Sequence, residues 1–139
     1  MEPQYLVLVR HGETEANLSG IIQGRKLDLS MTKRGRRQAK VCGKLLRSRF
    51  SFEHLISSPL LRARETARLL CRSFGLNEAE IEIDENLSER SYGDLASGKR
   101  WSECYDHPVL GKEIQRLRRI WRLSSSYLIT LMWQFLKRP

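Results

Sequence analysis

The sequence predicts an α/β fold in which short strands alternate with helices. Strands are indicated by an apolar run at residues 5–9, the pair Leu55-Ile56 and the alternating residues 81–84. Amphipathic stretches with helical spacing separate them. The order strand–helix–strand–helix–strand is typical of layered α/β folds with right-handed crossovers. The 139 residues, of which 40 % are hydrophobic, suffice for one core and are too few for two independent domains.

The three expected strands differ in their apolar pattern. Residues 5–9, Tyr-Leu-Val-Leu-Val, show no polar alternation, which favours a strand buried on both faces of a parallel sheet. Leu55 and Ile56 precede Ser-Ser-Pro and are expected to end a second strand. Residues 81–84 alternate, which favours a third strand nearer the edge of the sheet.

Two helices are expected between these strands. Thr32 is a good N-cap, and apolar residues follow it at helical spacing, at Ala39, Val41, Cys42, Leu45 and Leu46. The pair Ser58-Pro59 predicts the start of the second helix, with the serine hydroxyl as N-cap and proline in the first turn. Gly75 is expected to end that helix.

The net charge of +9 is concentrated at the end of the chain. Residues 112–139 hold seven Lys or Arg and one acidic residue, whereas residues 1–111 hold 18 basic and 15 acidic residues. A basic surplus is compatible with nucleic acid, a membrane surface or an anionic substrate, but charge alone is better explained by a solvated tail. No nucleic-acid-binding motif is present, so no nucleic-acid partner is expected.

Composition also bounds the class of protein. No apolar run reaches the roughly 18 residues of a spanning helix, so no membrane span is expected. Three cysteines without CxxC spacing or a Cys/His cluster argue against a disulfide scaffold and a structural zinc site. The start, MEPQYLVLVR, has no basic segment before its apolar run, which predicts no signal peptide and a cytoplasmic location.

Residues suited to phosphoryl transfer follow each expected strand. Arg10-His11-Gly12 follows the first, Arg62 follows the second, and Glu89 follows the third. The carboxyl ends of parallel strands form one edge of a sheet, so these side chains are expected to meet there. Each of them alone is as well explained by an ordinary surface position. It is their joint placement that indicates a site.

The residue types match that chemistry. A neutral imidazole at His11 can attack phosphorus, and the guanidiniums of Arg10 and Arg62 can hold the non-transferring oxygens and depress the histidine pKa. Gly12 would let backbone N–H groups approach a phosphate, and the N-terminus of the second helix would add a favourable dipole. The Glu89 carboxyl could protonate the leaving oxygen.

With these residues in this order, the chain resembles the histidine phosphatase superfamily, the phosphoglycerate-mutase-like enzymes. The resemblance runs from about Tyr5 to about Trp101, and four blocks carry it in order: LVRHGETEAN (residues 8–17), Ile22-Gln23-Gly24, SSPLLRARETA (57–67) and LSERSYGDL (87–95). It implies a three-layer α/β sandwich with a mainly parallel sheet.

The resemblance also implies roles for individual residues. His11 matches the nucleophile that becomes phosphohistidine, Arg10 and Arg62 the phosphate clamp, and Glu89 the proton donor and acceptor. The positions that match the substrate pocket are Arg10, Asn17, Gln23, Gly24, Arg62, Glu89 and Tyr92. The family needs no metal, so no cofactor is expected. The expected partner is a small phosphorylated metabolite, and the sequence indicates no oligomeric state.

One part of the family pattern is missing. Relatives carry a second histidine, followed by glycine, after a further strand beside the first, whereas the only His-Gly here is His11-Gly12. The chain therefore resembles a truncated family member that lacks this late strand. Residues 1–111 are expected to form an incomplete histidine phosphatase domain, and residues 112–139 a divergent basic and apolar tail.

Three functions follow from the resemblance. The first is a phosphomonoester phosphatase that acts through phosphohistidine at His11 on small sugar or sugar-acid phosphates. The second is phosphoglycerate mutase-type phosphoryl transfer, since the family includes both. The third is a truncated, catalytically inactive relative, because losing one member of a catalytic constellation costs on the order of 10²–10⁴ in rate.

Overall fold

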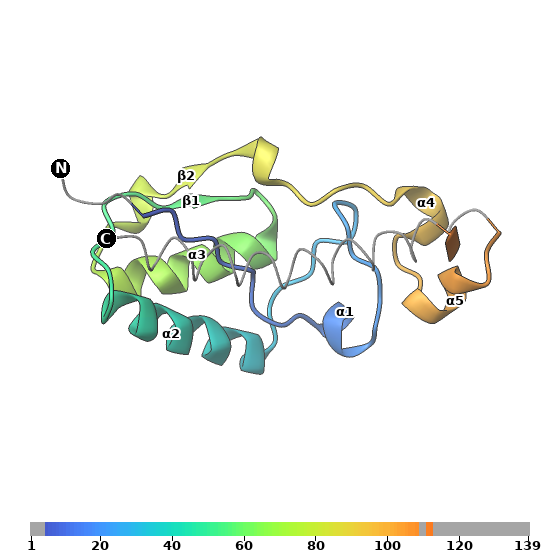
Figure 1. The fold of residues 1–139 in the computed structure, drawn as a ribbon, viewed down its shortest axis with the longest axis horizontal. Helices are drawn as coiled ribbons and strands as arrows, with labels where there is room; N and C mark the ends of the chain where they lie inside the picture. The colour runs from blue at the N-terminus through green and yellow to red at the C-terminus, as the bar shows by residue number, and fades with distance from the viewer. Residues whose placement is uncertain (1–4, 109–110, 113–139) are drawn as a thin grey trace. The chain divides into compact units, whose positions relative to one another are not determined.

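A computed structural model of the chain describes residues 5–108 and 111–112 (Figure 1). Its elements, in order, are α1 (Glu15–Leu18), α2 (Lys33–Arg47), β1 (Ile56–Ser57), α3 (Leu61–Phe74), η1 (Glu78–Glu80), β2 (Glu82–Ile83), η2 (Glu85–Leu87), α4 (Gly93–Ala96) and α5 (Trp101–Tyr105). Arg10–Trp101 form one compact unit, and the described residues before and after it belong to a second. The larger unit holds all the predicted site residues.

A parallel pair of strands joined by a helix confirms the α/β class. β1 pairs with β2 in the register Ile56↔Glu82 and Ser57↔Ile83. The backbone N–H of Glu82 donates to the carbonyl of Leu55 at 3.0 Å, and that of Asp84 to Ser57 at 2.9 Å. α3 makes the crossover that two parallel strands require and packs on β1. The strands lie where the sequence predicted the second and third.

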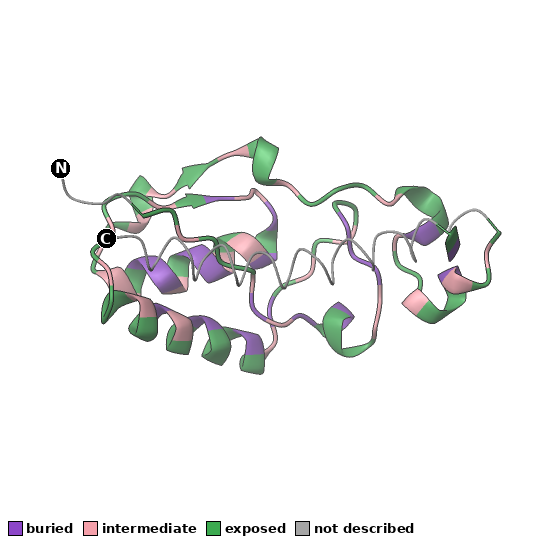
Figure 2. Ribbon diagram, in the orientation of Figure 1, coloured by how far each residue is buried: buried purple, intermediate pink, exposed green. Residues whose placement is uncertain are grey.

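The core of this unit lies between α2 and α3. α2 packs on α3, and its buried residues are small and spaced four apart: Gly35, Ala39 and Gly43. Figure 2 shows buried positions on the side of α2 that faces α3. A Cβ at Gly43 would lie 2.5 Å from the Ser73 Oγ, so glycine permits this close approach. From α3 the buried residues are Arg62, Thr66, Ala67, Leu70 and Cys71.

Two of the predicted helix ends are confirmed. Thr32 caps α2, because its hydroxyl accepts from the Gly35 N–H at 2.9 Å. Gly75 ends α3 in the left-handed conformation, at φ 76°.

The predicted start of α3 is wrong by a few residues. The helix begins at Leu61, and its N-cap, Leu60, provides no side-chain cap. The Asp28 carboxylate, from a loop 33 residues earlier, accepts from the Leu61 N–H at 2.8 Å instead. Ser58 makes only a 3.4 Å bond to the Leu60 N–H. A distant carboxylate therefore caps this helix, and local sequence patterns do not reveal such a partner.

The predicted first strand is not formed. Residues 5–9 make no strand pairing among the described residues, and Leu6 is 83 % exposed. A buried central strand needs hydrogen-bonding neighbours on both edges, and the described sheet has only the two strands β1 and β2. The apolar run therefore lacks the neighbours that its composition predicts.

The prediction for residues 112–139 falls, beyond Lys112, outside the described residues, so the expected domain boundary at residue 111 stays a prediction. Within the described part of the chain, no helix is long and apolar enough to cross a membrane.

Candidate active site

The His11 ring is oriented by a hydrogen bond to the backbone carbonyl of the next residue, Gly12. Its Nδ1 lies 2.8 Å from the carbonyl oxygen of Gly12, which can only accept, so Nδ1 carries the proton. In the neutral ring this leaves Nε2 with a free lone pair. The half-buried imidazole therefore presents an unprotonated nitrogen that can act as a nucleophile or a base.

The pKa of His11 is lowered from its ordinary value. Burial is the largest cause, and the positive charges of Arg62 and Arg10 act in the same direction. The Gly12 carbonyl and the Glu89 carboxylate oppose them. These interactions bring together all four residues predicted as catalytic, including Glu89, which lies 78 positions along the chain from His11.

A threonine links the histidine loop to the helix that carries Arg62. The Thr66 hydroxyl accepts from the Gly12 N–H at 3.1 Å and donates to the Arg62 carbonyl, one turn earlier in α3, at 2.8 Å. This role of Thr66 was not predicted, although the residue lies within the third motif and four residues after Arg62.

Gly12 is used differently from the prediction. Its N–H bonds to Thr66, and a Cβ there would lie 2.4 Å from the Gly35 carbonyl oxygen and 2.6 Å from the Met31 sulfur. Gly35 in turn has no room for a Cβ, which would lie 2.1 Å from the Glu13 carbonyl oxygen. The glycine after the histidine thus serves close packing of the loop against the start of α2.

Arg62 is 2 % exposed, and the loop that follows Gln23 holds its guanidinium. Nη2 donates to the Gly24 carbonyl at 3.0 Å, Nη1 donates to the Leu27 carbonyl at 3.4 Å, and Nη1 lies 3.5 Å from an Asp28 carboxylate oxygen. The buried Nε has no partner among the described residues. This N–H donor is therefore unsatisfied in the described structure.

Asp28 is a second residue that the sequence analysis missed. Its carboxylate caps α3 and pairs with Arg62. The N-terminus of α3 was predicted to attract a phosphate by its dipole, but an acidic side chain already satisfies its first N–H. The first N–H of α3 is therefore already paired and not free to bind a phosphate.

Gly24 joins the second and fourth sequence motifs. Its φ of +55° lies in the left-handed region, and a Cβ would lie 2.7 Å from the Tyr92 ring and 3.0 Å from the Arg90 carbonyl oxygen. The Arg90 guanidinium lies 5.0 Å from the Tyr92 ring centre, and Trp101 meets that ring edge-on at 6.0 Å. The Tyr92 ring is thus fixed beside the loop that holds Arg62.

The remaining predicted site residues differ in exposure. Buried Gln23 donates its Nε2 to the Thr14 hydroxyl at 2.8 Å, and its Oε1 has no partner among the described residues. Asn17 is exposed and forms a capping box with Thr14 at the start of α1. Exposed Arg10 and Glu89 lie on the solvent side, and the Glu89 carboxylate accepts from the Arg90 N–H at 3.1 Å.

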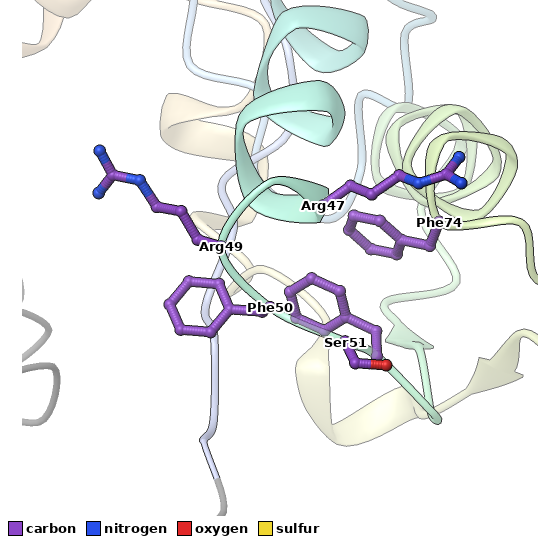
Figure 3. Close-up of a pocket in the computed structure, with 6 residues that line it drawn as sticks. Arg47, Arg49, Phe50, Ser51 and Phe74 are labelled. Atoms are coloured by element: carbon purple, nitrogen blue, oxygen red, sulfur yellow. The ribbon is translucent and has the colours of Figure 1, made fainter.

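A pocket among the described residues lies away from the predicted site residues. It measures about 490 Å³ and opens where α2 and α3 end, with Arg47, Arg49, Phe50, Ser51, Phe52 and Phe74 around it (Figure 3). The Phe52 and Phe74 rings stack at 4.2 Å. None of the predicted site residues lines this pocket. The described residues contain no group of His, Cys, Asp or Glu that could hold a metal ion.

Comparisons with known proteins identify relatives of the chain. The family profile of the histidine phosphatase superfamily (branch 1) matches residues 6–119. The chain is 41 % identical over 99 residues to fructose-2,6-bisphosphatase TIGAR of Xenopus laevis, covering 70 % of this chain and 35 % of that protein. It is 38 % identical over 114 residues to a 2,3-bisphosphoglycerate-dependent phosphoglycerate mutase of Afipia carboxidovorans, covering 77 % and 55 %.

Solved structures share the fold. A mycobacterial glucosyl-3-phosphoglycerate phosphatase superposes with a TM-score of 0.62 at 32 % identity, over 70 % of this chain and 44 % of that one. A phosphoserine phosphatase from Entamoeba histolytica gives 0.56 at 32 % identity, over 67 % and 43 %. The chain thus spans about half the length of these relatives, or less.

Proposed function

The chain belongs to the histidine phosphatase superfamily, branch 1, and we propose that it hydrolyses phosphomonoesters through a phosphohistidine at His11. The proposed substrates are small sugar or sugar-acid phosphates. The names of the relatives support this class, since they refer to fructose-2,6-bisphosphate, glucosyl-3-phosphoglycerate and phosphoserine.

The observation that carries the proposal is the state of His11. Its Nδ1–H is donated to the Gly12 carbonyl, and burial with two nearby arginines lowers the ring pKa. The lowered pKa favours a neutral imidazole near neutral pH, and the bond from Nδ1–H to Gly12 selects the tautomer in which Nε2 is free. A structural histidine would gain nothing from two cations beside it.

The proposed reaction has two displacement steps. In the first, the Nε2 lone pair forms a bond to phosphorus, the ester P–O bond breaks, and the Glu89 carboxyl gives its proton to the leaving oxygen. In the second, the Glu89 carboxylate takes a proton from water as that water attacks the phosphorus. The P–N bond then breaks, inorganic phosphate leaves, and both side chains return to their starting states.

The arginines have an electrostatic role in both steps. Arg10, and the Nε–H of Arg62, would bind oxygens of the transferring phosphoryl group and offset its negative charge. Because Gly24, Leu27 and Asp28 already hold the far end of the Arg62 guanidinium, its orientation is set before substrate binds. Asn17, the free Oε1 of Gln23, and Tyr92 would contact the rest of the substrate.

Two alternatives remain distinct from this proposal. In a phosphoglycerate mutase-type reaction, a sugar-acid hydroxyl rather than water would take the phosphoryl group from His11, as the name of the Afipia relative suggests. In a catalytically inactive relative, the same residues would bind phosphate without transfer. The second alternative is favoured by the sequence, in which His11-Gly12 is the only His-Gly pair.

Phosphate release distinguishes the three functions. We expect the full chain to release phosphate from sugar-acid phosphates. His11→Ala should reduce that release by at least about 10³-fold, whereas exposed His54, replaced as a matched control, should leave it unchanged. Isomerised substrate without phosphate release would favour the mutase. No turnover by the folded parent chain would favour the inactive relative.

A further inference from the structure

Helix α2 carries many positive charges that the proposed reaction does not use. The fifteen residues of the helix contain seven Lys or Arg and no acidic residue. Arg34 and Arg36 pair with Glu13 and Glu65. Lys33, Arg37, Lys40 and Lys44 are exposed and make no ion pair with another described residue.

Two exposed apolar side chains lie within this charge. Val41 is 61 % exposed and Leu45 is 53 % exposed. Arg37, Val41 and Leu45 are spaced four residues apart, and Lys40 and Lys44 form the adjacent row, so the five share one face of the helix. We call these five residues the outer face of α2. Figure 2 shows the exposed side of the helix opposite the buried residues that face α3.

The opposite side of α2 is buried. Gly35, Ala39 and Gly43 are buried, and Gly43 lies against Ser73 of α3. Because these small residues lie on the buried side of α2, Lys33, Arg37, Lys40 and Lys44 extend outward without an ion pair in the described structure, beside exposed Val41 and Leu45. An amphipathic helix normally buries its apolar residues, so Val41 and Leu45 need a separate explanation.

We propose that the outer face of α2 binds anionic membrane surfaces. A lipid interface accepts both kinds of side chain at once: Val41 and Leu45 reach the acyl boundary while the lysine and arginine head groups bind lipid phosphates. A nucleic-acid backbone would neutralise the charges but leave the apolar side chains against polar phosphates. Each cation near an anionic membrane increases partitioning roughly fivefold. This proposal is independent of the catalytic one.

The test measures binding of the full chain to vesicles of phosphatidylcholine and phosphatidylserine in equal parts, by co-sedimentation. We expect binding to these vesicles and none to pure phosphatidylcholine. The double substitution Lys40→Glu with Lys44→Glu should reduce partitioning at least about tenfold. The matched control, Arg64→Glu with Arg68→Glu on α3, changes the same charge at the same spacing on exposed residues and should have a much smaller effect.

The apolar part of the proposal has its own variant. Val41→Ser with Leu45→Ser should also weaken binding to the vesicles, whereas Leu18→Ser with Leu87→Ser, similarly exposed, should not. Circular dichroism of every variant checks that the fold is retained. Equal losses from the α2 and α3 charge variants, no loss from the Val41 and Leu45 variant, or tighter binding of the parent to duplex DNA than to vesicles would overturn the proposal.

Discussion

At the scale of single residues, the proposed reaction depends on the protonation of His11. Arg62 and Arg10 lower its pKa, and Glu89 raises it, although burial is the largest cause. The three motifs in which these residues occur lie far apart in sequence. The effect of each of these side chains on the His11 pKa therefore tests whether the folded chain brings the three motifs together.

Two neutralising substitutions should move the His11 pKa in opposite directions. Arg10→Gln removes a positive charge and should raise it, whereas Glu89→Gln removes a negative charge and should lower it further. Both residues are exposed, so neither change opens a cavity. NMR titration of the ring protons measures both shifts, with His54 as an internal control. Shifts of the same sign, or none, would show that the side chains are not gathered as described.

The lowered pKa also fixes the expected pH dependence. In the folded chain His11 protonates only below the ordinary histidine pKa, so Nε2 stays nucleophilic into mildly acidic solution, and phosphorylation should fall as the pH drops through the lowered pKa. The unfolded chain binds this proton more readily. The His11 contribution to stability is therefore present above the ordinary histidine pKa and is lost on acidification.

At Gly24, both the backbone conformation and the close packing require glycine. Gly24→Ala should destabilise the fold by about 2–4 kcal/mol, because the new Cβ both strains a left-handed backbone and meets Tyr92 and the Arg90 carbonyl. Gly20, with φ of +66° and open space around it, is the matched control, and Gly20→Ala should cost only about 1–2 kcal/mol. Urea unfolding measures both. Equal losses would argue against contact between the 23–28 loop and Tyr92.

At the scale of elements, the two long helices, α2 and α3, were predictable from local patterns, whereas the short helices α1, α4 and α5 were not predicted. Thr32 and Gly75 mark helix ends because their partners lie within a few residues. The start of α3 was mispredicted because its cap, Asp28, comes from a distant loop. For the same reason Thr66, which joins His11's loop to Arg62's helix, could not be found from spacing alone.

Removing the Asp28 carboxylate should therefore weaken α3 and free Arg62 together. Asp28→Ala should lower the free energy of unfolding by about 1–2 kcal/mol, as expected for loss of an N-cap. Asp28→Asn keeps an oxygen for the Leu61 N–H and should cost less. Chemical denaturation of the three proteins provides the comparison. If asparagine is as damaging as alanine, the negative charge beside Arg62 matters more than the cap.

At the scale of the whole molecule, the α/β class was predictable, whereas the extent of the sheet was not. The apolar composition of residues 5–9 predicts that they are buried, but burying them requires neighbouring strands formed by other residues. The described sheet has two short strands, and Leu6, Leu8, Ile56 and Ile83 are exposed. Local pattern therefore identified apolar segments correctly but could not supply their partners.

Truncating the side chains of Leu6 and Ile22 tests whether residues 5–9 form a buried strand. Leu6→Ala should change the free energy of unfolding by less than about 0.5 kcal/mol, because the side chain is 83 % exposed. Ile22→Ala, at a residue 1 % exposed, should cost about 2–5 kcal/mol. Thermal or urea unfolding gives both values. A cost at Leu6 comparable to that at Ile22 would restore the predicted buried strand.

Phosphohistidine trapping on the full chain tests directly whether His11 is phosphorylated. Intact mass would be recorded for the parent and for His11→Ala after brief exposure to a bisphosphorylated sugar acid and an alkaline quench. We predict one added phosphoryl group on the parent, none on His11→Ala, and an unchanged adduct on the His54→Ala control. A folded parent that gains no phosphoryl group, or a His11→Ala variant that gains one, would contradict the account.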